Sequence, residues 1–422
     1  MKKKFLIMFI ISIFGYLLFT EEDINNKDIL KLSLNDVLEL SLNKNLTIRN
    51  SKIDLDNYLL SLQTVYNQFM PSLSFGFSVR DNLIDSKINL SLSVNSSLNL
   101  NPASFFNIVK AINDYKQGNI TYEIALKKFK IEVKKYYYNL LILKKNIELK
   151  EIELNNARIV YNTILLKYND GIISVVDKMK SEYNLSEKEI EFKKAKNNFE
   201  IALIVFKNII GLEDNVEIEL TDNLPEIDIA KNIKDVTLDN NLDLKKIEYD
   251  LKNSINTRNS YIASFFPSFG LSYSFSNSFA PPWDNFLNYS SSLNISLGLS
   301  LDNLLPFSTV QVNLIKQNRN IEKISNSIEI ERKNKEIELK KSQKDIESQK
   351  EIINSYLMNV EIAKKTYDII EKYYFSGSSS FYELKEAEKD LTNSNIKLLQ
   401  AKYDYLCKIF DLEYLLNIEI YK

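Results

Sequence analysis

The chain contains, at residues 126–171, the segment LKKFKIEVKKYYYNLLILKKNIELKEIELNNARIVYNTILLKYNDG, which has neither proline nor glycine before its last residue. Strands rarely exceed about ten residues, so an uninterrupted stretch of this length predicts a helix. Apolar or aromatic residues recur at every seventh position, namely Leu126, Val133, Leu140, Ile147, Leu154, Tyr161 and Tyr168. This heptad spacing predicts packing along one seam, as in a coiled coil. We expect the helix to extend from about residue 103 to 170, on the order of 100 Å.

The other half of the chain contains a second heptad seam, formed by Leu339, Ile346, Ile353, Val360, Tyr367 and Tyr374. Each seam ends at a tyrosine three residues before a glycine, Tyr168 before Gly171 and Tyr374 before Gly377. The two glycines are about 200 residues apart, and each is followed by another long helical pattern. This duplication predicts two tandem repeats of long coiled-coil helices.

Each repeat also contains two stretches in which apolar residues alternate with Ser, Asn or Gly. Such alternation predicts strands with one apolar and one small polar face. The strands are expected at about residues 71–81, 87–100, 267–279 and 289–301. Prolines mark the junctions between these strands and the helices, at Pro71, Pro102, Pro267 and Pro306. Proline is tolerated at strand ends and helix starts, which fits this placement.

The alternating strands allow two interpretations. They could form soluble hairpins whose apolar faces lie in a core, because any half-buried antiparallel sheet alternates. They could also form a membrane barrel with lipid outside and a wet lumen. Four strands cannot close a barrel of useful bore, whereas three copies of the chain would supply twelve.

Composition excludes most enzymatic and nucleic-acid functions. The 422 residues include no His, so the chain has no imidazole base or metal ligand. Cys407 is the one cysteine, which excludes an intramolecular disulfide and a cysteine metal cluster. With 54 Lys+Arg and 56 Asp+Glu, no basic field is available for a phosphate backbone. We therefore expect no enzyme activity, no cofactor, no metal and no nucleic-acid partner.

The N-terminus predicts export from the cytoplasm. Three lysines precede an apolar run at residues 5–19, which is the order of a secretory signal peptide and is short for a membrane span. The linker between the repeats is polar and contains Pro225. The expected division of the chain is a signal peptide at 1–20, a first repeat at 21–212, a linker at 213–236 and a second repeat at 237–422.

These features together resemble the TolC-like outer-membrane efflux proteins over essentially the whole mature chain. The resemblance rests on the order and duplication of several segments: LSLNDVLELSLNKN at 32–45, the two Pro-Ser strand starts, the tips KYNDG at 167–171 and KYYFSG at 372–377, and AKYDYL at 401–406. It implies an α+β membrane protein that forms a homotrimer. Each trimer would build a twelve-stranded barrel in outer-membrane lipid that continues into an α-helical barrel in the periplasm.

The resemblance also implies a function and partners. Such a channel is a passive duct of a tripartite efflux or type I secretion system. It would bind a periplasmic adaptor (membrane fusion) protein and, through it, an inner-membrane ABC or proton-driven transporter. Its adaptor-facing tips would be at Tyr168, Asp170, Gly171, Gly377 and Ser378. The competing interpretation is an exported coiled-coil structural or adhesive protein without channel activity.

The acidic residues after the tip glycines are the candidate gate. Asp177 and Glu383 each lie six residues after a tip glycine, and Glu386 follows about one helical turn later. In a trimer each would form a ring of three carboxylates that attracts cations. They could instead be ordinary solvated helix positions. The resemblance assigns Tyr374 to the links of the closed tips, whereas Ser379 replaces the family's arginine.

Overall fold

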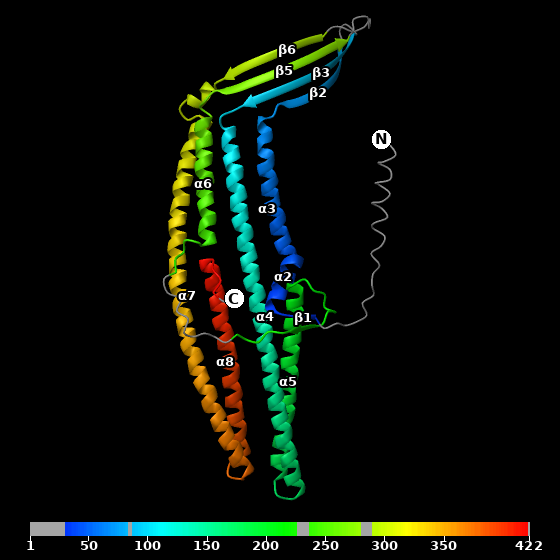
Figure 1. Ribbon diagram of the computed structural model, residues 1–422, viewed down its shortest axis with the longest axis vertical. Coiled ribbons are helices and arrows are strands. Elements are labelled where there is room, and N and C mark those ends of the chain that lie inside the picture. Colours follow the sequence, from blue (N-terminus) through cyan, green and yellow to red (C-terminus); the bar gives the residue numbers. More distant parts are fainter. Residues whose placement is uncertain (1–29, 83–86, 226–235, 280–288, 421–422) are drawn as a thin grey trace.

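The computed structural model describes residues 30–82, 87–225, 236–279 and 289–420. The expected signal peptide at 1–20 lies outside them. The molecule is elongated, with a sheet at one end and long helices that run away from it side by side (Figure 1). It thus contains long helices and one larger sheet, as the sequence predicted.

The helices lie side by side in one row. Their bounds are α2 (Leu34–Lys44), α3 (Leu46–Thr64), α4 (Ser104–Asn169), α5 (Val175–Ile209), α6 (Leu242–Ala263), α7 (Thr309–Phe375) and α8 (Phe381–Leu416). The order in the row is α3-α4-α6-α7 near the sheet and α5-α4-α8-α7 toward the far end. The 66-residue α4 and the 67-residue α7 run the full length of the column. Helices α3 and α6 accompany them near the sheet, and α5 and α8 accompany them toward the far end (Figure 1). The order helix, two strands, two helices occurs twice.

The larger sheet has four antiparallel strands in the order β2-β3-β5-β6. They are β2 (Ser72–Asn82), β3 (Lys87–Leu100), β5 (Ser268–Phe279) and β6 (Tyr289–Gly298). The sequence placed the end of the last strand near residue 301, but β6 ends at Gly298 and a 3₁₀ turn, η2 (Leu301–Leu304), follows. A matching turn, η1 (Val65–Phe69), precedes β2.

The register of the sheet separates its residues into two faces. Apolar residues pair across neighbouring strands, as in Phe77 with Leu92, Val94 with Phe275 and Leu271 with Ile295. Between them, Ser, Asn and Gly pair on the opposite face, where serine hydroxyls bond across the strands. The apolar face is open: Phe75 and Leu297 are each 76% exposed.

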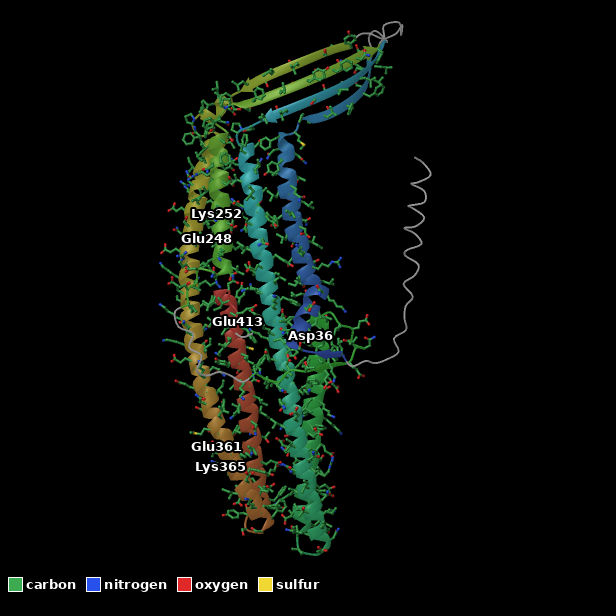
Figure 2. All side chains as sticks on the ribbon, viewed as in Figure 1. Asp36, Glu248, Lys252, Glu361, Lys365 and Glu413 are labelled. Carbon is green, nitrogen blue, oxygen red and sulfur yellow. The ribbon has the colours of Figure 1, made fainter. Side chains whose placement is uncertain are left out.

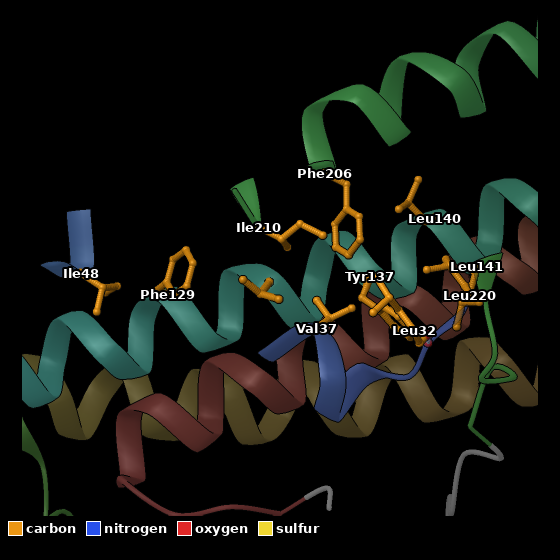
Figure 3. Close-up of a cluster of buried hydrophobic side chains, with 11 residues drawn as sticks. Leu32, Val37, Ile48, Phe129, Tyr137, Leu140, Leu141, Phe206, Ile210 and Leu220 are labelled. Carbon is orange, nitrogen blue, oxygen red and sulfur yellow. Dashed lines mark hydrogen bonds between the residues drawn. The ribbon is translucent and has the colours of Figure 1, made fainter. Parts of the chain in front are cut away.

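The first apolar core lies at mid-height, where α2, α4 and α5 meet (Figure 3). Val133, Tyr137 and Phe206 are fully buried there. The Tyr137 hydroxyl donates to Asp222 at 2.9 Å and contacts the Leu32 carbonyl at 3.2 Å. These bonds tie the beginning of the described chain to the segment that follows α5.

A short parallel strand pair supports the same core. It joins β1 (Leu30–Leu32) to β4 (Ile218–Leu220), which lies within the region that the sequence indicated as a linker. A three-residue strand contains too few alternating positions to be seen as a pattern. Strand β4 was therefore missed in the sequence.

The second apolar core joins α7 to α8 and contains the second heptad seam. Ile346 and Ile353 of that seam pack against Tyr405, Ile409 and Leu412. Charged residues cover the outer faces of the helices, as in the pair Glu361 and Lys365, whose charged atoms are 2.7 Å apart (Figure 2). The buried apolar surface of α7 and α8 is thus concentrated along the second heptad seam, where these two helices meet.

Candidate functional site

The two hairpin tips have the same backbone structure. Gly171 follows α4 with φ 73°, and Gly377 follows α7 with φ 82°. In each tip the glycine N–H and the next N–H donate to carbonyls of the last helical turn, as in a Schellman motif. These left-handed positions favour glycine because it lacks a Cβ.

The helix that leaves each tip begins with a serine cap. Ser174 and Ser380 precede α5 and α8, and their hydroxyls accept the backbone N–H groups of Asp177 and Glu383. The Ser174 hydroxyl donates back to Asp177 at 2.8 Å, and Ser379 donates to Glu383 at 2.5 Å. Two of the three candidate gate carboxylates, Asp177 and Glu383, are therefore engaged in helix capping.

Capping also changes the electrostatics of Glu383. The hydrogen bonds from Ser379 and Ser380 favour the ionised carboxylate and hold the pKa of Glu383 below its ordinary value. The spacing Ser-x-x-Asp or Ser-x-x-Glu at a helix start is the sequence signal of such a cap. The sequence argument singled out the two acids but missed the helix caps formed by Ser174 and Ser380.

The structure brings two of the candidate gate residues together. Tyr374, at the end of α7, is half-buried and packs against Phe381, with ring centroids 6.2 Å apart. Burial and the negative charge of Asp177 raise the pKa of the Tyr374 hydroxyl. Asp177 belongs to the other hairpin, so its charge acts on the tyrosine from one tip of the protomer to the other. Glu386 is exposed on α8 and stands apart from them.

The remaining tip residues lie on the outermost turns. Lys178 places its ammonium 5.3 Å from the centre of the Tyr168 ring, and Asp170 is the exposed C-cap of α4. The Ser378 N–H donates to the Tyr373 carbonyl at 2.8 Å. All five of the expected adaptor-facing residues thus lie at the end of the molecule opposite the sheet (Figure 1).

The four prolines lie between helical and extended segments. Pro71 and Pro267 immediately precede β2 and β5. Pro102 lies two residues before α4, and Pro306 lies three residues before α7, next to Phe307 with φ 63°. Each is therefore where the chain changes direction between the sheet and the helical column.

A buried ionic network inside the first hairpin was not predicted from the sequence. Lys188 of α5 lies 2.8 Å from Glu153 of α4, and Lys150 lies 2.9 Å from Glu191. Glu153 is 4% exposed and Lys188 is 8% exposed. Burial opposes the charge of Lys188, but the bond and attraction from Glu153 and the charge of Glu191 outweigh it and raise the pKa of Lys188. The network therefore joins α4 to α5 inside the first hairpin.

Within the described residues, none of the helices combines the length and apolar character needed to cross a bilayer. The same residues contain no group of three or more metal-ligating side chains placed to bind an ion.

Comparisons with known proteins support one family. Residues 234–417 match the family model described as outer membrane efflux protein, and a comparison with curated proteins finds no match. The fold is similar to that of CusC, with a TM-score of 0.79 and 15% identity over 92% of each chain. It is also similar to that of VceC of Vibrio cholerae, with a TM-score of 0.77 and 13% identity over 92% of this chain and 97% of that one.

A third similar structure is the CmeC outer membrane channel of Campylobacter jejuni, with a TM-score of 0.77, 16% identity and coverage of 91% of this chain and 85% of that one. The family model thus spans the second half of the chain, and the fold of these solved proteins extends over nearly all of it. Residues 234–417 therefore match the outer membrane efflux protein family that the sequence indicated, and the fold of the chain is similar to that of these solved proteins.

Proposed function

We propose that the chain is the outer-membrane channel of a tripartite efflux or type I secretion system, and that it works as a passive duct. The observation that carries the proposal is the two-faced sheet at one end of the helical column. Its open apolar face, which includes Phe75 and Leu297, would be unfavourable in water and favourable against lipid. Its serine-rich face suits a wet lumen.

The sheet also suggests how copies of the chain assemble. Strands β2 and β6 are the two edges of the four-stranded sheet, and an edge strand presents unpaired backbone groups. Pairing β6 of one copy with β2 of the next, three times, would close twelve strands into a barrel without edges. The two tandem repeats of each copy would then contribute one helical hairpin each to a helical barrel in the periplasm.

The far end of the column would be the periplasmic entrance. Both tips expose apolar side chains there, including Ile172, Val176 and Tyr382, at 70%, 53% and 72%. Such a surface fits contact with a periplasmic adaptor protein that joins the channel to an inner-membrane ABC or proton-driven transporter. Glu386, Glu383 and Asp177 would face the narrowing lumen and favour cations.

The test uses the full chain extracted from membranes in detergent. Its oligomeric mass and its single-channel conductance in a planar lipid bilayer are measured on the same sample. We expect a trimer with a small, cation-selective conductance, because the resting entrance is narrow and acidic. A monomer or dimer that never inserts would contradict the proposal and favour an exported coiled-coil protein with an adhesive sheet.

A further inference from the structure

A small polar cavity lies between the two helical hairpins of one protomer. Its volume is about 10 Å³, close to the space that one water molecule requires. All four hairpin helices contribute to its lining: Asn156 from α4, Asn184 from α5, Tyr367 from α7, and Lys385 and Glu388 from α8. The surroundings of a side chain in this cavity therefore depend on how closely the two hairpins pack.

Two buried side-chain oxygens of these lining residues lack hydrogen-bond partners among the described residues. They are Oε1 of Glu388 and Oδ1 of Asn184, and both are fully buried. Each is an acceptor, so an ionised Glu388 cannot bond to the Asn184 carbonyl oxygen. A proton on Glu388 removes the mismatch, because a carboxylic acid can donate a hydrogen bond to the Asn184 oxygen.

The positive and negative side chains around Glu388 nearly balance one another when Glu388 itself is left out. Burial raises the pKa of Glu388, Lys188 and Lys385 oppose this shift, and the charges of Glu153 and Glu191 add to it, so that the net pKa is about 7. The groups that face the site or belong to its network are Lys150 and Glu153 on α4, Glu187, Lys188 and Glu191 on α5, Tyr367 on α7, and Lys385 on α8. An ionised Glu388 adds a further negative charge to a buried interface.

We propose that Glu388 is a proton-binding site that couples pH to the packing of the two hairpins. With its proton, Glu388 donates to Asn184 and holds α8 against α5. Without it, the buried carboxylate faces an unpaired acceptor and two other carboxylates, and the hairpins separate more easily. If the chain is the duct proposed above, opening of its periplasmic end becomes easier as the pH rises.

The sign follows from the folded pKa, which is above the ordinary value of 4.5. Between these two values the packed state binds a proton that the separated state releases. Packing is therefore most stable at acidic pH and weakens as the pH rises toward about 7. Above a pH of about 7, the stabilisation of packing by the Glu388 proton is fully lost.

The experiment measures hydrogen exchange in the purified full chain. Backbone amides at residues 180–192 and 381–395 are followed from about pH 5.5 to about pH 8, after correction for intrinsic exchange. We expect opening of this interface to increase on the order of 30-fold over that range. The Glu388→Gln variant should stay protected throughout, because glutamine keeps a donor and cannot ionise.

The matched control is Asp390→Asn, which removes an exposed carboxylate from the same helix and should keep the wild-type pH dependence. A second variant, Lys385→Gln, removes a cation that favours ionised Glu388, so the transition should move to higher pH. Unchanged pH dependence in Glu388→Gln, or a transition in Lys385→Gln that stays or moves down, would overturn the proposal. Hydrogen exchange requires neither a conductance measurement nor a pump. The result can therefore overturn the role of Glu388 without overturning the proposed channel function.

Discussion

Asp177 and Glu383 show how one carboxylate can have a structural and a functional explanation at once. Both lie at the third position of a helix and bond to a serine at its start. Their matching positions after the two tips therefore already have a cause in helix capping. Glu386 has no such engagement among the described residues, so its charge is the cleaner indicator of an acidic entrance.

Replacing Glu386 by Ala should reduce the preference for cations by a factor of several, because the proposed trimer would lose a ring of three charges. The measurement is the reversal potential of single channels in a salt gradient. Replacing Glu383 by Ala should also free the start of α8, since its carboxylate accepts the Ser380 N–H at 2.9 Å. Asp390→Asn serves as the control for charge on the same helix. Unaltered selectivity in Glu386→Ala would return this residue to a solvated surface role.

The pH dependence of the α8 cap has the opposite sign to that of Glu388. Hydrogen bonds lower the pKa of Glu383, so the cap contributes fully above the ordinary pKa of 4.5. Its contribution is lost as the pH falls through the lower folded value. Acidic conditions therefore loosen the tip turn while they tighten the hairpin interface around Glu388.

At the scale of elements, the tips depend on glycine in a left-handed conformation. Replacing Gly171 by Ala should destabilise the tip by about 1–2 kcal/mol, because an L-residue with a Cβ disfavours positive φ. Space is not the cause, since nothing lies within 4 Å of a Cβ built there. Gly171→Asn should cost less, because asparagine tolerates this region. The rate of limited proteolysis at the tip measures the difference, and equal rates for the Ala and Asn variants would contradict the backbone explanation.

The buried network between α4 and α5 makes a separate prediction about stability. Lys188→Met should lower the free energy of unfolding by about 2–4 kcal/mol, because Glu153 keeps only Lys150 as a partner in a buried site. The double variant Glu153→Gln, Lys188→Met should lose less than the sum of the two single variants. Urea denaturation of the purified protein measures both.

The exposed pair Glu329 and Lys333 provides the control for this network. Its two side chains are each 67% exposed and their charged atoms are 2.6 Å apart. Exposed ion pairs contribute little to the free energy of unfolding, so Lys333→Met should leave the stability almost unchanged. An equal loss from Lys188→Met and Lys333→Met would show that burial of the network has no energetic role.

Helices and strands whose apolar residues recur regularly over many positions could be predicted from the sequence. The contacts between these elements could not. Helices α4 and α7 follow from the heptad seams, and the strands of the four-stranded sheet follow from alternation. The pairing of Glu153 with Lys188 joins two helices across a turn, and no local pattern specifies which of the many charges on each helix meet. Glu388 lies at a four-helix contact and was missed for the same reason.

At the scale of the whole molecule, the two ends have different environments. The sheet exposes an apolar face and the helical column exposes a charged one (Figure 2). The mid-height cores, with Tyr137 in one and Tyr405 in the other, hold the column together without covering the sheet. The sheet must therefore find its apolar environment outside the protomer, which a lipid bilayer supplies.

Two neighbouring residues of β6 test this argument. Ile295 is on the apolar face, where it pairs with Leu271, and Asn294 is on the polar face, where it pairs with Ser272. Ile295→Lys should destabilise membrane insertion by about 2–4 kcal/mol if the position is near the middle of the bilayer. Asn294→Lys should insert normally, because it would add its charge to a wet lumen. The fraction of protein in the outer membrane and the trimer yield measure the effect. Equal insertion of both variants would contradict a lipid-facing apolar sheet, whereas loss of insertion in Ile295→Lys alone would assign the two faces to lipid and lumen.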